Sequence, residues 1–113
     1  MTVSPYCRAV SVNGQTYADP SEDLLYELMY DFELPHNGYL IVEGSGDDGW
    51  YVVAALLEDG TYEVRFRDPM RRVYRVQAGA RLPEIVNDMI VWITDTARFH
   101  TARAAQAQHI WLD

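Results

Sequence analysis

The chain lacks lysine and has a single cysteine, Cys7. One cysteine excludes an intramolecular disulfide, and a lone thiol is typical of a reducing compartment. We expect Cys7 to be an unreactive apolar residue on a strand rather than a nucleophile. The first twelve residues lack the basic start and apolar core of a signal peptide, and no apolar run approaches the ~18 residues that cross a bilayer. These absences predict a cytoplasmic protein with no membrane association.

Positive charge is almost absent from the first half of the chain. Residues 1–60 contain eleven acids and one basic residue, Arg8, whereas residues 61–113 contain eight arginines and six acids. The net charge of the whole chain is −8. A surface dominated by acid repels phosphate backbones and attracts basic proteins. We therefore predict a protein partner with a basic surface and no direct binding to nucleic acid, with solubility alone as the alternative reading of the acidity.

Recognisable catalytic, metal and cofactor motifs are also missing. The three histidines, His36, His100 and His109, are scattered, and none has a second histidine or the cysteine at the i+3 or i+4 spacing of a helical metal site. No serine stands in a nucleophile elbow, and Cys7 has no histidine-paired context. The residues therefore predict no catalytic site, no metal and no cofactor, which favours a binding protein over an enzyme.

Residues 44–49 read Gly-Ser-Gly-Asp-Asp-Gly and match a dinucleotide-binding pattern literally. Such glycines must lead into a helix whose N-terminus holds the pyrophosphate. Here they lead into Trp50 and a strand, and Asp47 and Asp48 would face the phosphates. An acidic hairpin tip is therefore the better interpretation of this loop.

The stretch from Tyr39 to Gln77 is predicted to form four consecutive antiparallel strands. In the third, residues 61–67, apolar and charged residues alternate, which is typical of a strand with one buried face. The second, residues 50–57, is apolar throughout and needs cover on both faces or a partner on one. The four predicted strands are Tyr39–Glu43, Trp50–Leu57, Thr61–Arg67 and Arg72–Gln77.

A hairpin is expected to precede these strands at an edge of the sheet. Residues 8–12 and 15–17 flank Asn13-Gly14, a dipeptide that suits a two-residue turn because both residues tolerate positive φ. A helix should then run from Asp19 to about Glu33, with Asp19 as the N-cap and Pro20 in the first turn. Its apolar stripe consists of Leu24, Leu25, Leu28, Met29 and Phe32.

A second, longer helix should begin at Leu82-Pro83-Glu84 and carry the main apolar stripe. The tail from Phe99 to Asp113 either extends this helix or returns as a short strand at residues 109–112, with Trp111 docked on the body. The chain is thus predicted to be a single α+β domain over residues 1–113. Its expected architecture is an antiparallel four- to six-stranded sheet, a meander, packed by two helices.

The predicted partner-binding surface lies on the outer side of the first helix and on the loop between the first two strands of the meander. Tyr26 and Tyr30 stand one turn apart among acids, an arrangement that suits a contact with a basic partner. The alternative is that both rings lie flat on neighbouring loops. The predicted set is Glu22, Asp23, Tyr26, Glu27, Tyr30, Asp47 and Asp48.

A basic cluster on the third and fourth strands is a second possible working surface. It consists of Arg65, Arg67, Arg71, Arg72 and Arg75. Internal ion pairing with the acids of the first half is its simpler interpretation, and an anion-binding patch is the alternative. The sequence does not decide between this cluster and the acidic surface.

The order of parts resembles the immunity proteins of bacterial polymorphic-toxin systems. The matching features are an early helix, a four-strand meander, the helix opening Leu82-Pro83-Glu84 and the closing Ile110-Trp111. The resemblance implies binding to a cognate toxin, such as a nuclease or deaminase, and occlusion of its site, with acidic residues in place of substrate phosphates. Two alternatives are a phage anti-defence inhibitor that mimics nucleic acid and a non-inhibitory regulatory or scaffold subunit that forms a homodimer through Trp50–Leu57.

Overall fold

The structure is a computed structural model that describes residues 6–46 and 48–112, except for the side chains of residues 107–112. Six strands form one antiparallel sheet in the order β2-β1-β3-β4-β5-β6. The elements in chain order are β1 (Cys7–Ser11), β2 (Thr16–Ala18), α1 (Glu22–Tyr30), β3 (Tyr39–Gly44), β4 (Tyr51–Leu56), β5 (Tyr62–Asp68), β6 (Val73–Gly79) and α2 (Leu82–Leu112).

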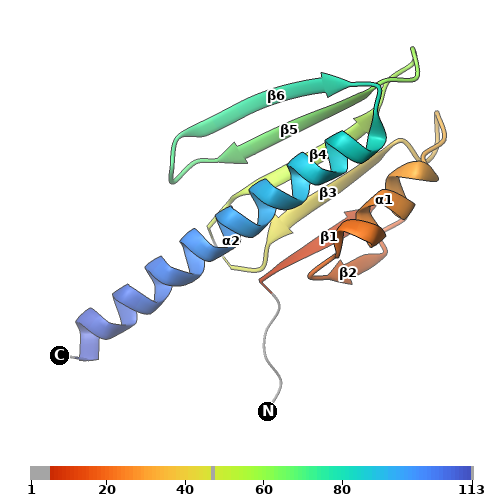
Figure 1. Cartoon of the computed structure of the whole chain (residues 1–113). Helices are drawn as coiled ribbons and strands as arrows, with labels where there is room; N and C mark the ends of the chain where they lie inside the picture. Colours follow the sequence, from red (N-terminus) through yellow and green to blue (C-terminus); the bar gives the residue numbers. More distant parts are fainter. Residues whose placement is uncertain (1–5, 47, 113) are drawn as a thin grey trace.

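The α+β fold class is confirmed, with a six-stranded meander-containing sheet packed by two helices. The helices lie on the same side of the sheet, and α2 crosses its central strands while α1 lies beside α2 (Figure 1). The hairpin β1–β2 occupies the edge next to β3, as its position before the meander predicted. In the part of the chain that the structure describes, the opposite face of the sheet carries no helix (Figure 1).

The loop between β1 and β2 is one residue longer than predicted, whereas the loop between β4 and β5 consists of residues 58–60, as the predicted strand ends require. Ser11 N–H donates to Gln15 O, which leaves three residues in the β1–β2 loop instead of the expected two. The β4–β5 loop is built in the same way, because Leu57 N–H donates to Thr61 O. In both loops the third residue is glycine with positive φ, 86° at Gly14 and 85° at Gly60, which is the usual geometry of a three-residue hairpin loop.

The predicted N-cap of the first helix is wrong by two residues. Ser21 caps α1, and its hydroxyl accepts a hydrogen bond from the amide of Leu24 at 3.1 Å. Asp19 instead turns towards β1, where its carboxylate accepts hydrogen bonds from the amides of Tyr6 at 2.9 Å and Cys7 at 3.1 Å. These contacts with β1 take the Asp19 side chain away from the helix, and Ser21, two residues later, becomes the cap.

Helix α1 also ends three residues earlier than expected, at Tyr30. The backbone of Glu33 forms an antiparallel bridge with Asn37, with N–H to O distances of 2.7 and 2.8 Å. The Asn37 side chain donates a hydrogen bond to Asp31 O at the end of the helix. These bonds use the backbone groups that a further helical turn would need.

One hydrophobic core lies between the sheet and the two helices. Strand residues of one parity enter it, such as Val42, Val52 and Phe66, and they meet Leu25 and Met29 of α1. The predicted stripe of α1 is confirmed for its buried members, and α2 contributes Leu82, Ile85, Val86, Met89 and Ile93. Trp50 lies in the same core against Gly44, where a Cβ atom would overlap the indole ring.

The tail of the chain extends the second helix, so the strand alternative for residues 109–112 is wrong. Helix α2 is continuous over 31 residues. At 1.5 Å per residue such a helix is about 46 Å long, and its C-terminal part projects beyond the sheet (Figure 1). The predicted docking of Trp111 falls on a side chain outside the described part of the structure.

Candidate functional site

The outer side of α1 presents the predicted tyrosines and acids to solvent. Tyr26 and Tyr30 stack on each other with ring centroids 6.1 Å apart and ring planes 17° apart. Their exposed fractions are 37% and 69%. Glu22, Asp23 and Glu27 are exposed beside them. The five predicted residues of α1 therefore share one surface, which we call the α1 face.

The carboxylates of the α1 face are not used inside the protein. Among the described residues, none of Glu22, Asp23 and Glu27 takes part in an ion pair. The helix has no basic residue in its last turn. Their negative charge is thus available to a partner.

Tyr62 of β5 extends the aromatic part of this surface. Its hydroxyl lies 3.5 Å from Met29 O, and its ring packs against Phe32 at a centroid distance of 6.4 Å. Partial burial raises the pKa of Tyr62, and the nearby Tyr26 and Tyr30 phenols raise it further. Tyr62 thus brings a third tyrosine near Tyr26 and Tyr30, where α1 meets the sheet.

The β3–β4 loop does not join the α1 face directly. Asp48 Oδ1 lies 3.6 Å from His100 Nδ1 of α2, and its side chain is about one-third exposed. Asp47 lies outside the described residues, so its predicted role stays a prediction. The structure places Asp48 beside a buried polar cluster instead of beside Tyr26 and Tyr30.

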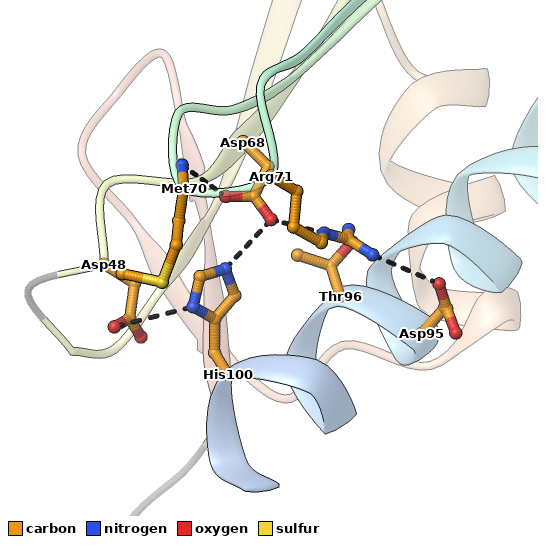
Figure 2. Close-up of polar contacts among 7 residues, drawn as sticks. All are labelled: Asp48, Asp68, Met70, Arg71, Asp95, Thr96 and His100. Carbon is orange, nitrogen blue, oxygen red and sulfur yellow. Dashed lines mark hydrogen bonds and ion pairs between the residues drawn. The ribbon is translucent and has the colours of Figure 1, made fainter. Parts of the chain in front are cut away.

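This buried cluster joins the β5–β6 turn to the middle of α2 (Figure 2). Asp68 is fully buried, and its Oδ2 lies 2.7 Å from Arg71 Nε and 2.9 Å from His100 Nε2. Its Oδ1 accepts from the Met70 amide at 3.2 Å. The Arg71 guanidinium also donates to the hydroxyl of buried Thr96. The cluster thus fixes the turn on the helix.

His100 connects the cluster to the β3–β4 loop. Its ring stacks on Trp50 with a centroid distance of 6.5 Å. Its Nδ1 atom is buried and has no hydrogen-bond partner among the described residues, although Asp48 lies close by (Figure 2). A neutral imidazole can donate to one of the two flanking carboxylates, whereas an imidazolium can donate to both. His100 therefore holds the loop and the turn on α2 from one position.

Asp68 should make the stability of the protein depend on acid. Burial alone would raise the pKa of this carboxyl, but hydrogen bonds and charge from Arg71 and His100 outweigh burial and hold the pKa below its ordinary value. Its contribution to stability is therefore present above about pH 4, the ordinary range of an aspartate, and is lost as the pH falls through the lower folded value. We expect the difference in unfolding free energy between the wild type and Asp68→Asn to shrink from pH 7 to pH 3 in urea titrations. A difference that stays constant over this range would contradict the coupling.

The sequence contained two signals for this cluster that the prediction did not use. Asp68 has the same parity as Val64 and Phe66 and so continues the buried face of β5. Thr96 and His100, four residues apart, continue the apolar stripe of α2 beyond Ile93. Polar residues at core positions on two elements indicate a buried pair.

The five arginines of the basic cluster do not form one patch. Arg65 pairs with Glu63 at 2.7 Å, and Arg71 pairs with Asp68. Arg75 lies over the Phe66 ring at 4.4 Å, on the side of the sheet that faces the helices. Three of the five arginines are therefore engaged within the protein, Arg65 and Arg71 in ion pairs and Arg75 in a cation–π contact.

An apolar groove lies between the start of β1 and the second half of α2. It encloses about 630 Å³ and is lined by Tyr6, Cys7, Ile90, Ile93 and Ala97, among others. Burial, followed by the nearby Asp19 carboxylate, raises the pKa of the Cys7 thiol to about 12. The thiol is thus protonated at neutral pH, in agreement with the expected unreactive cysteine on a strand.

Comparison with known proteins identifies no relative of this chain. No family model, curated protein or solved structure matches this chain. Among the described residues, no three histidine, cysteine or acidic side chains come together as a metal-binding group. None of the described helices is long and apolar enough to span a membrane. The surfaces of the protein itself therefore carry the information on its function.

Proposed function

We propose that this protein is an inhibitor that binds a basic surface of a partner protein through the α1 face and occludes the partner's functional site. The partner class is an enzyme that acts on nucleic acid or nucleotides, such as a toxin nuclease or deaminase. Such enzymes carry arginines and lysines that contact substrate phosphates, and exposed carboxylates can replace those phosphates.

The stacked pair Tyr26–Tyr30 inside an acidic field is the observation that supports this proposal. The rings offer a large contact area at low entropic cost, and their mutual stacking restricts them before binding. Tyrosines at the centre of an interface are frequent hot spots. Glu22, Asp23 and Glu27 around them would steer a basic partner and speed its association.

Removing both tyrosines should weaken inhibition strongly. If each ring contributes about 2 kcal/mol, as hot-spot residues do, Tyr26→Ala with Tyr30→Ala should lower affinity about 1,000-fold. The tagged full chain would be used to capture its partner from host cells. The captured enzyme's activity on DNA, RNA or nucleotides is then measured against increasing inhibitor.

Tyr39→Ala with Tyr74→Ala provides the matched control, because these tyrosines are similarly exposed, at 44% and 59%, and lie on the face of the sheet without helices. The control should inhibit like the wild type. Equal inhibition by the two double variants would remove the α1 face as the binding site. A captured partner whose activity does not change would contradict inhibition itself.

A further inference from the structure

The face of the sheet opposite the helices is largely apolar, and no helix or strand among residues 6–46 and 48–112 covers it. The registers place three rows of side chains across it, each running from one strand to the next. The rows are Val10-Ile41-Val53-Arg65-Val76, Arg8-Glu43-Tyr51-Arg67-Tyr74 and Tyr39-Ala55-Glu63-Ala78. We call these residues the open face.

Strand β4 shows why this face needs cover. Val52 and Ala54 point into the core, whereas Tyr51, Val53 and Ala55 point to the open face. An antiparallel sheet with one face in water usually alternates apolar and polar residues. The outward residues of β4 are all apolar or aromatic, so its pattern is that of a strand covered on both sides.

The open face is also unlike the rest of the protein in charge. It has three arginines and two glutamates, which leaves one positive charge, whereas the whole chain has a net charge of −8. Two of the arginines are neutralised locally, since Arg8 pairs with Glu43 at 2.8 Å and Arg65 with Glu63 at 2.7 Å. Two copies of this acidic protein would therefore repel one another least at the open face.

We propose that a second copy of the chain covers the open face, related to the first by a two-fold axis that runs along β4. This rotation places β3 of one copy opposite β5 of the other. Tyr51 and Val53 then meet their own counterparts at the centre. Glu43 on β3 and Arg67 on β5 flank Tyr51 in the same row. The rotation therefore brings Arg67 of each copy opposite Glu43 of the other, once on each side of the axis.

The charge complementarity is specific to this arrangement. Arg67 makes no ion pair within the described part of the chain, and the Glu43 side chain is 36% exposed. The axis along β4 gives two symmetric Arg67–Glu43 contacts around an apolar centre. This is the self-complementary pattern of a two-fold interface.

The size of the open face suits a dimer of moderate affinity. Five strands about 4.8 Å apart and about 20 Å long give a projected area on the order of 450 Å². Accessible area is larger than projected area because side chains stand out from the sheet, and a standard interface uses about 800 Å² per partner. We therefore expect a dimer that dissociates at roughly micromolar concentration.

This dimer leaves both α1 faces on its outside, because the helices lie on the other side of each sheet (Figure 1). It does not depend on the proposed inhibition. A protein that dimerises but inhibits no enzyme would support the dimer and contradict the inhibition. A protein that inhibits as a monomer would do the reverse.

A charge swap tests the arrangement. Arg67→Glu would place glutamates opposite Glu43, and Glu43→Arg would place arginines opposite Arg67, so each variant alone should be monomeric. Mixed in equal amounts, the two variants restore an opposite-charge contact on both sides of the axis. Light scattering during size exclusion should report 13.0 kDa for each single variant up to millimolar protein. For the wild type and the mixture, the mass should rise from near this value at low micromolar protein to twice this value at millimolar protein.

The exposed pair formed by Arg81, just before α2, and Glu84 in its first turn provides the control. Arg81→Glu and Glu84→Arg should each remain dimeric alone. Recovery of the dimer on mixing shows that both swapped variants are folded. The proposal is overturned if the wild type is monomeric at millimolar concentration, if the single variants dimerise alone, or if their mixture stays monomeric while circular dichroism shows both to be folded.

Discussion

Asp68→Ala is expected to lower the unfolding free energy by about 3–5 kcal/mol, the usual cost of removing one partner from a buried ion pair. The substitution leaves the largely buried Arg71 guanidinium without its buried carboxylate partner and leaves His100 Nε2 without a partner. It also removes the acceptor of the Met70 amide in the turn. Because small domains are stable by only about 5–15 kcal/mol, a large part of the total would be lost. Urea titrations at pH 7 measure the change.

Asp95→Ala provides a matched control on the same arginine. Asp95 Oδ2 lies 3.4 Å from Arg71 Nη1, but its side chain is 75% exposed. Water solvates both groups at this contact, so the loss should stay below about 1 kcal/mol. If the two variants lost similar amounts of unfolding free energy, burial would not strengthen the contacts of Asp68.

The main features of the fold could be predicted because each of them repeats along the chain. Alternation at Val64 and Phe66 predicts which face of β5 is buried, and helical spacing predicts which residues of α2 enter the core. Features set by single long-range contacts could not be predicted in this way. Ser21 caps α1 because β1 engages Asp19, and no local rule ranks these two residues.

The candidate site could likewise be predicted where it follows from a repeating pattern, but not where it depends on single contacts. Exposure of Tyr26 and Tyr30 follows from their place off the apolar stripe, and the structure agrees. Their stacking could not be inferred, since it depends on side-chain rotamers. Asp48 was grouped with them by charge alone, but His100, 52 positions later in the chain, determines where it lies.

Reversal of Glu22, Asp23 and Glu27 to arginine is expected to abolish inhibition, with affinity at least about 1,000-fold weaker. Each reversal replaces an attraction with a repulsion against a basic surface, and like charges in an interface cost several kcal/mol. The fold should survive, because the three side chains are exposed and lie off the buried side of α1. Loss of two acids from the first turn costs about 0.3–1 kcal/mol each through the helix dipole.

The control must carry the same total charge, because a less acidic protein attracts any basic partner less. Glu58→Arg, Glu84→Arg and Asp88→Arg change exposed acids away from α1, and either triple variant has a net charge of −2, two units per reversal above −8. If the α1 face binds, only the α1 variant loses inhibition, and wild-type association slows with salt. If both triple variants lose inhibition equally, net charge rather than the α1 face attracts the partner. Full inhibition by the folded α1 variant would show that the partner binds elsewhere.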